Sequence, residues 1–340
     1  MINKEESKMN IKRPFKIIGT GTYLPENHVP SEDIEVKYGI RKGFSEKYSG
    51  VKARYKISDE TNGTMAAAAV QQAMDNANVS INDIDLLISG SATFDYILPN
   101  QASMVKYHLK DCETSDCGCV DVNTTCLSFL ASLDLASRYL DGVQYKKIVV
   151  VSSEISSKGL NPENWEIVTL FGDAAAAVVI EYDESANHGA IHYDMVTYSE
   201  AAKSTIVEGG GNVNHPSEVP YSRALHSFTM EGKDLLRMAK DKIPEFMSRF
   251  FAPLPTELEE LDFIIPHQAS KAGIMLFEHL YDFSNVNILK NLSTHGNCIA
   301  ASMPTVLVQN IQNKTLKQGD TVMLTGTAAG FSIGGILIKI

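Results

Sequence analysis

A cysteine stands where an apolar helix is expected to begin, a position that favours nucleophilic chemistry. Cys126 follows the segment VDVNTT and precedes the amphipathic stretch SFLASLDLASRYL. Backbone N–H groups at a helix N-terminus carry partial positive charge, which stabilises a thiolate or a developing oxyanion. Cys126 is therefore a candidate nucleophile, although a lone cysteine beside an apolar helix is more often a small core residue.

Two further residues could act with it. His267 lies in FIIPHQAS, directly after an apolar strand-like run, and chemistry in open α/β sheets gathers at strand ends. A histidine there could support nucleophile or proton-transfer chemistry, since its charge changes near neutral pH; eight other histidines show that an ordinary structural role is also common. Asn297 lies in STHGNCIAAS, where small neighbours allow close backbone packing and an amide can donate hydrogen bonds to an anion.

The elements that must position these residues alternate between strand and helix patterns. This alternation predicts an α/β fold with buried sheets. Predicted strands cover residues 15–22, 86–91, 120–123, 147–152, 174–182, 188–198, 263–266, 321–325 and 334–340, and predicted helices cover 64–76, 101–109, 128–140, 233–250, 271–281 and 302–313. The glycine-rich stretch 208–222 is expected to be a surface loop.

The same order of segments occurs twice along the chain. IDLLISGSA leads to VNTTCLSFLASLDLA and KKIVVVSSE in the first half, and LDFIIPHQA leads to LSTHGNCIAASMPTVLV and GDTVMLTGT in the second. This faint duplication predicts two similar α/β halves that face each other. In this interpretation Cys126 and Asn297 are quasi-equivalent. We expect a flexible tail at 1–14, a nucleophile-bearing half at 15–185 and a half with the histidine and asparagine at 186–340.

Composition excludes several classes of function. The 340 residues carry 30 Lys and Arg against 41 Asp and Glu, so the net charge is −11, which disfavours nucleic acid and anionic membrane surfaces. No apolar run is long enough to span a bilayer and the N-terminus does not read as a secretory signal, which predicts a cytoplasmic protein. Five cysteines favour free thiols, and their C-x4-C-x-C-x6-C spacing is not that of ordinary zinc sites. No metal site is expected.

Taken together, several motifs resemble one family. VNTTC before a helix, PHQAS, HGNCIAASMP, LFGDAAAAVVI and the closing GTAAGFSIGGILI occur in the order and spacing of ketoacyl-ACP synthase III (KAS III), a condensing enzyme of the thiolase superfamily. The similarity spans nearly the whole chain. It implies the thiolase-like five-layer α-β-α-β-α fold built from two duplicated halves, and an acyltransferase of EC 2.3.1.

The resemblance also implies roles for individual residues. An acyl thioester would be transferred to Cys126, after which a malonyl-type thioester would lose carbon dioxide while His267 and Asn297 stabilise the enolate. The backbone N–H groups of Cys126 and Ala329 would hold the acyl oxyanion. Acyl-ACP or acyl-CoA and malonyl-ACP would be the substrates, and no further cofactor is implied.

Other positions concern partners. Relatives form homodimers in which the segment aligned to FDYILPNQAS caps the partner's acyl pocket, which places Leu98 at a gate and Phe94 nearby; an ordinary interface leucine is the alternative. Lys271 is a candidate contact for an acidic carrier protein, and a solvated surface charge is the alternative. Phe44 and Tyr48 replace a Trp and an Arg that often clamp coenzyme A, and the arginine expected before FGD is missing. These losses favour carrier-bound or unusual acyl donors.

Three hypotheses follow. The first is a decarboxylating condensing enzyme of fatty-acid biosynthesis or of specialised polyketide, resorcinol or pyrone biosynthesis. The second is a thiolase-fold acyltransferase that passes its acyl group to an oxygen or nitrogen nucleophile. The third is a non-catalytic subunit, which the complete Cys-His-Asn set disfavours. Asn297 favours condensation over simple acyl transfer, because only condensation needs an enolate hole.

Overall fold

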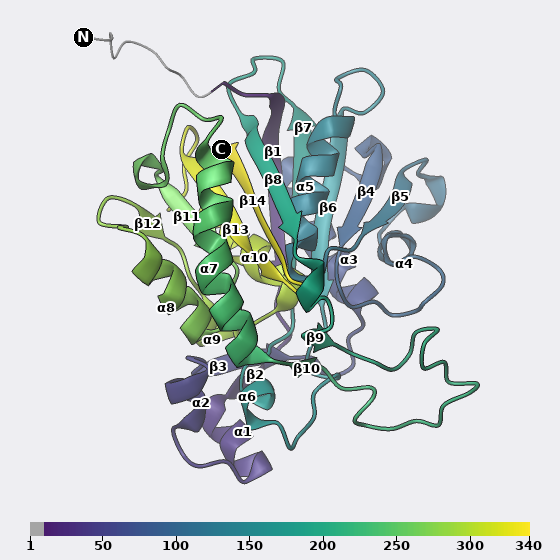
Figure 1. The fold of residues 1–340 in the computed structure, drawn as a ribbon. Coiled ribbons are helices and arrows are strands. Elements are labelled where there is room, and N and C mark those ends of the chain that lie inside the picture. The colour runs from purple at the N-terminus through teal and green to yellow at the C-terminus, as the bar shows by residue number, and fades with distance from the viewer. Residues whose placement is uncertain (1–9) are drawn as a thin grey trace.

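The computed structural model describes residues 10–340; positions 1–9 of the predicted tail lie outside these residues. Two five-stranded sheets, joined edge to edge, form the centre of the molecule (Figure 1). The first contains β1 (Arg13–Tyr23), β4 (Leu86–Gly90), β5 (Gly118–Val122), β6 (Lys147–Glu154) and β7 (Ala174–Tyr182). The second contains β8 (Gly189–Thr197), β11 (Phe263–Pro266), β12 (Asn287–Ile288), β13 (Thr321–Ala328) and β14 (Ser332–Lys339).

The two sheets have the same topology. The strand order is β5-β4-β6-β7-β1 in the first and β12-β11-β13-β14-β8 in the second, so each strand has a counterpart at the same place in the other repeat. The first three strands of each order are parallel, and the remaining pairs are antiparallel. The structure therefore confirms the duplicated α/β architecture.

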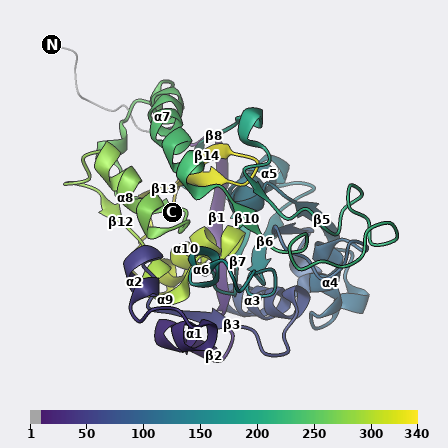
Figure 2. The ribbon, with the colours of Figure 1, turned by 60° about the horizontal axis from the view of Figure 1, so that its bottom comes forward.

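Helices lie on both faces of each sheet and create the five layers. The helices of these layers are α3 (Asn62–Ala77), α4 (Gln101–Tyr107), α5 (Ser128–Tyr139), α7 (Gly232–Phe251), α8 (Lys271–Leu280) and α10 (Ser302–Gln312). α5 and α10 form the middle layer, where each contacts strands of both sheets. α3 covers the outer face of the first sheet, and α7 covers that of the second with α8 beside it (Figures 1 and 2).

Strand residues explain why both sheets are buried. In β6, Ile148 and Val150 face the middle layer, whereas Val149 and Val151 belong to the cluster under α3. Because successive side chains of a strand point to opposite faces, a continuous apolar run suits a sheet that is covered on both sides. The long apolar runs of the sequence thus predicted these strands correctly.

Short elements escaped prediction. They are β2 (Asn27–Pro30), β3 (Ala53–Lys56), β9 (Thr205–Ile206), β10 (Thr229–Met230), α1 (Ser31–Tyr38), α2 (Phe44–Tyr48), α6 (Trp165–Val168), α9 (Leu292–His295) and the two-residue β12. β1 also begins earlier than expected, at Arg13, whose guanidinium pairs with Asp134 of α5 at 2.7 Å. The last two residues of the predicted tail therefore belong to a strand. The predicted boundary at 185/186 falls in the connection between β7 and β8, and we propose to divide the repeats there.

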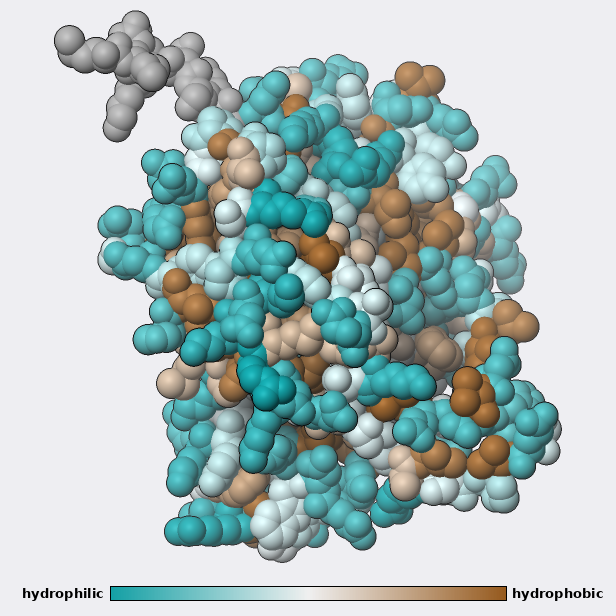
Figure 3. Space-filling model, in the orientation of Figure 1, coloured by the Kyte–Doolittle hydropathy of each residue, from teal (hydrophilic) through white to brown (hydrophobic). Residues whose placement is uncertain are grey.

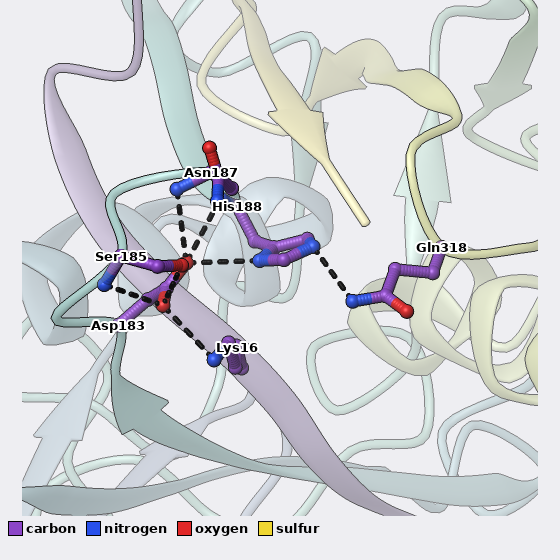
Figure 4. Close-up of polar contacts among 6 residues, drawn as sticks. All are labelled: Lys16, Asp183, Ser185, Asn187, His188 and Gln318. Atoms are coloured by element: carbon purple, nitrogen blue, oxygen red, sulfur yellow. Dashed lines mark hydrogen bonds and ion pairs between the residues drawn. The ribbon is translucent and has the colours of Figure 1, made fainter.

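A buried carboxylate organises that connection (Figure 4). Asp183 accepts hydrogen bonds from the backbone N–H groups of Ser185, Asn187 and His188, and it pairs with Lys16 of β1 at 3.0 Å. The His188 ring lies 2.8 Å from the same carboxylate and reaches Gln318, just before β13, with its other nitrogen. These hydrogen bonds hold the pKa of Asp183 well below its usual range, although burial acts in the opposite direction. One side chain thus ties together β1, the link between the repeats and the second repeat.

None of the helices in residues 10–340 combines the length and the apolar character needed to cross a bilayer.

Candidate active site

The candidate nucleophile lies in a tight turn between β5 and α5. Cys126 is half-buried in a 3₁₀ turn, Thr125–Leu127, that runs directly into α5. The turn is closed by Ser128, whose hydroxyl accepts a hydrogen bond from the Thr124 N–H at 3.0 Å. Thr125 has a φ of 52°, in the left-handed region that β-branched residues normally avoid. Cys126 packs against the apolar cluster of the middle layer, next to Ala329, which follows β13.

Backbone donors surround the sulfur atom. Burial raises the pKa of the Cys126 thiol to about 12, and the nearby Glu154 carboxylate adds to that rise. The N–H groups of Ala329 and of Cys126 itself act in the opposite direction, because they can hydrogen-bond the thiolate. The Thr125 hydroxyl also donates to the Ala329 carbonyl at 3.2 Å, which holds the two segments together. The predicted pair of backbone donors, Cys126 and Ala329, therefore converges on this thiol.

His267 follows β11 and lies against β13. The backbone N–H of His267 donates to the Thr325 carbonyl at 2.8 Å. Its side chain packs on Gly326, and a Cβ atom at position 326 would collide with the Cβ of His267. The imidazole is buried, Nδ1 has no hydrogen-bond partner, and burial lowers the ring's pKa to about 4. The ring is therefore neutral at pH 7, a state in which it donates one N–H and carries no charge.

Asn297 is held in one orientation by its neighbours. Its side-chain oxygen accepts the Ile299 N–H at 2.8 Å, and its amide nitrogen donates to the Ala269 carbonyl, two residues after His267, at 3.1 Å. An amide nitrogen has two hydrogens, so one remains for a ligand. The structure thus brings Asn297 next to the His267 segment, while Cys126 and His267 both lie at the end of β13.

The structure corrects the predicted equivalence of Cys126 and Asn297. The counterpart of Asn297 is Asn123: its side-chain oxygen accepts the N–H two residues ahead, at 2.9 Å, as that of Asn297 does. Ser302 closes the second turn as Ser128 closes the first, and Ile299 has a φ of 47° like that of Thr125. Cys126 therefore corresponds to Ala300. The connections that lead from the preceding strands to the two turns differ in length, so the order of the segments alone does not fix which turn residues correspond.

The predicted gate residues lie on an exposed apolar segment. Leu98 is 84% exposed and Phe94 is 51% exposed, and Tyr96 and Ile97 between them are exposed too. Together with Asn123, this segment lines a pocket beside β5. β5 forms one edge of the joined sheet and exposes Val120. Apolar side chains gather on the side of Figure 3 where Figure 1 shows β5 and α4.

Lys271 lies on a different face, at the start of α8. The backbone N–H of Lys271 donates to the carbonyl of Ser49, just after α2. The side-chain ammonium lies 3.5 Å from the Lys47 carbonyl. In α2, Phe44 stacks on Tyr48 with ring centroids 4.3 Å apart and meets Trp165 edge-on at 6.0 Å. Phe44 and Trp165 line a shallow groove with Glu163 and Glu166, so carboxylates stand where a clamp for a coenzyme A phosphate would need cations.

Two residues near the nucleophile were missed by sequence reasoning. Asn123 could have been found from the shared spacing in NTTCLS and NCIAAS. Glu154, the last residue of β6, carries no sequence signal beyond its place after an apolar run, because acidic residues at strand ends are usually solvated. No group of three or more metal-ligating side chains occurs within residues 10–340.

Comparison with known proteins identifies the family. The family model for 3-oxoacyl-[acyl-carrier-protein] synthase III matches residues 120–199, and the model for the C-terminal part of the same family matches residues 254–340. The chain belongs to the KAS III family. The two matched segments contain all three candidate catalytic residues. They also contain residues 123–128, called the nucleophile turn below, and residues 297–302, its counterpart in the second repeat.

Individual KAS III relatives align with this chain over nearly its full length. Beta-ketoacyl-[acyl-carrier-protein] synthase III of Neisseria gonorrhoeae is 29% identical over 325 residues, which cover 95% of this chain and 98% of the relative. The protein of that name from Vesicomyosocius okutanii is 28% identical with the same coverage. The crystal structure of the Aquifex aeolicus synthase III aligns with a TM-score of 0.84 and 26% identity, covering 96% of this chain and all of that one.

More distant structures share the KAS III fold. The priming β-ketosynthase of the R1128 polyketide pathway aligns with a TM-score of 0.85 at 20% identity, covering 98% of each chain. Cerulenin-bound OleA of Xanthomonas campestris aligns with a TM-score of 0.81 at 23% identity, covering 96% of this chain and 97% of that one. The thiolase-like fold predicted from the motifs is thereby confirmed.

Proposed function

We propose that this protein is a β-ketoacyl-ACP synthase III-type condensing enzyme, an acyltransferase that extends an acyl group by decarboxylative Claisen condensation. The observation that carries the proposal is the composition of the site: a thiol facing two backbone N–H groups, beside a neutral imidazole and an amide with a free hydrogen. KAS III relatives across the full chain length support it.

The first half-reaction needs a nucleophile and an oxyanion hole. The Cys126 sulfur attacks the carbonyl carbon of an acyl thioester, and the N–H groups of Cys126 and Ala329 stabilise the oxyanion that forms. The C–S bond of the donor then breaks, and the departing thiolate takes up the proton lost by Cys126. The raised pKa of Cys126 means that the resting enzyme holds a thiol, so this proton transfer accompanies the attack.

The second half-reaction needs donors without charge. The C–C bond to the carboxylate of a malonyl thioester breaks, carbon dioxide leaves, and the electron pair forms an enolate whose oxygen is stabilised by His267 and Asn297. The enolate carbon attacks the acyl-Cys126 carbonyl, the C–S bond breaks, and the released Cys126 thiolate takes up a proton from water to restore the thiol. A cationic imidazole would instead pair with the malonyl carboxylate and oppose its loss, so the low pKa of His267 suits this step.

The donor is proposed to be carried by a protein rather than by free coenzyme A. The groove beside Phe44 and Trp165 presents Glu163 and Glu166, whose charges repel the phosphates of coenzyme A. Lys271 and Lys47 lie next to it and could attract an acidic acyl carrier protein. No metal or organic cofactor is required in this scheme, since thioester exchange and decarboxylation use only the residues named.

A cytoplasmic homodimer is proposed as the working form. β5 leaves one backbone edge of the sheet unpaired, and the exposed Tyr96, Ile97 and Leu98 lie next to it. Exposed edges and contiguous apolar surfaces favour association. In such a dimer Leu98 and Phe94 would reach the partner's acyl pocket and limit the acyl chain.

Intact-protein mass spectrometry tests the function directly. The protein is incubated with acyl-CoA and acyl-carrier thioesters of increasing chain length and then with malonyl carrier protein. We expect a mass gain on Cys126 from carrier donors, which disappears as a β-keto thioester is released. Acylation without condensation would favour transfer to an oxygen or nitrogen nucleophile, and no acylation by any donor would favour a non-catalytic subunit.

A further inference from the structure

Glu154 is fully buried at the end of β6, between the nucleophile turn and the segment of residues 92–98, called the gate segment below. It forms no ion pair with any residue in 10–340. Acidic residues are almost never buried unless they are paired, because loss of hydration destabilises the charge. An amide has one acceptor oxygen, whereas a carboxylate accepts hydrogen bonds at both oxygens, as Glu154 does here. The carboxylate is therefore suited to hold the segments on either side of it.

On one side, the carboxylate holds the start of the gate segment. One oxygen accepts the Ala92 N–H at 2.7 Å, and the other accepts the Thr93 N–H at 2.9 Å and the Thr93 hydroxyl at 2.6 Å. Further along, Asp95 accepts two N–H groups at the start of α3, and Asp121 accepts two at the start of α4. The gate is thus fixed at both ends, and the exposed residues 96–99 lie between these anchors.

On the other side, the carboxylate faces both repeat turns. A hydrogen bond from the Ala300 N–H stabilises its charge, and Ala300 is the counterpart of Cys126. Burial raises the pKa values of two thiols, Cys126 and Cys298, and the Glu154 charge adds to the rise at both; at Cys298 the charge of Asp173 adds more than that of Glu154. Burial raises the pKa of Glu154 to about 7, although the Ala92, Thr93 and Ala300 donors oppose that shift.

We propose that Glu154 is a positioning residue of the condensation site: its carboxylate holds the gate segment 92–98 beside the nucleophile turn, and its negative charge lowers the reactivity of the Cys126 thiol in the empty site. The claim that Glu154 holds the gate segment rests on the proposed function, since it concerns acyl chains. The claim about the charge does not, since the reactivity of the Cys126 thiol can be measured without any acyl donor.

The charge is tested by alkylation of the full-length protein with iodoacetamide from pH 6 to 10, followed by peptide mass spectrometry at Cys126. Because an anion disfavours a neighbouring thiolate, Glu154→Gln should alkylate about three to ten times faster than wild type at pH 8. In wild type, Glu154 ionises near pH 7, so the alkylation rate of Cys126 should rise less steeply with pH above that point. In Glu154→Gln the alkylation rate should rise with pH without that change of slope. Glu181→Gln is the matched control, since it removes a charge at the opposite end of β6 and β7, where Glu181 pairs with Lys147.

The gate is tested with Glu154→Asp, which keeps the charge and shortens its reach. We expect its alkylation profile to match wild type while its KM for long acyl donors changes several-fold and its kcat with short donors does not. Superimposed alkylation profiles of Glu154→Gln and wild type would overturn the charge role, and an unchanged chain-length preference of Glu154→Asp would overturn the gate role. If no donor acylates any variant, the proposed function fails but the alkylation result still decides the charge role.

Discussion

The two repeat turns have the same backbone but different chemistry. Each has an asparagine whose side chain caps the N–H two residues ahead, a β-branched residue with positive φ, and a serine that closes the turn before a middle-layer helix. At the fourth position one turn has Cys126 and the other has Ala300. Conversely, Asn297 is buried beside the His267 segment, whereas Asn123 is exposed. The duplication thus supplies one scaffold twice, and the proposed nucleophile and the proposed enolate donor are divided between the copies.

The largest effect should come from making the first turn resemble the second. Cys126→Ala places the residue of Ala300 at the nucleophile position and removes the only proposed acyl acceptor, so acyl-enzyme formation should be lost completely. Mass spectrometry after incubation with a reactive donor measures this. Persistent acylation would assign the nucleophile to another residue, and unchanged thermal unfolding would show that the fold survives.

The asparagines allow a matched pair of variants. Asn297→Ala should slow malonyl decarboxylation by about 10²- to 10³-fold, because it removes one donor to the developing oxyanion. Acylation should stay near the wild-type rate. Asn123→Ala removes the equivalent turn bond and should affect decarboxylation far less. Release of carbon dioxide by pre-acylated enzyme provides the measurement, and equal losses in the two variants would contradict the division of roles.

Loosening the link between the repeats tests whether they depend on each other. Asp183→Asn should lower the free energy of unfolding by about 1–3 kcal/mol, because buried donors lose part of their acceptor. Since the folded-state pKa of Asp183 is depressed, its contribution is present above its unfolded pKa of about 4 and is lost as the pH falls through the folded value. Urea unfolding at pH 7, pH 4 and pH 3 should show a difference between variant and wild type that is nearly unchanged at pH 4 and shrinks below it.

The smallest effect concerns the serines that close the turns. Ser128→Ala and Ser302→Ala each leave one backbone N–H without its acceptor, and each should cost about 1 kcal/mol of stability. Similar costs in chemical denaturation would extend the equivalence of the turns to their energetics. A difference of several-fold would mean that one turn depends on tertiary contacts the other lacks.

Sequence reasoning succeeded where burial dictates composition. The apolar, β-branched runs that form β6, β7, β13 and β14 have the length and composition of strands covered on both faces, and the helices of the middle layer show clear periodicity. β2, β3 and α2 escaped because short, half-exposed elements leave no such pattern. The candidate site residues came from motif positions, whereas Glu154 became visible only once β6, the gate segment and the second turn were seen to meet.

The middle layer determines how the molecule must fold. α5 and α10 each pack on both sheets, and one apolar cluster contains residues such as Leu133 of the first repeat and Val306 of the second. A fragment ending after β7 would expose that surface to water. Repetition in the chain therefore does not create two autonomous folding units, because neither repeat has a complete core until the other has docked.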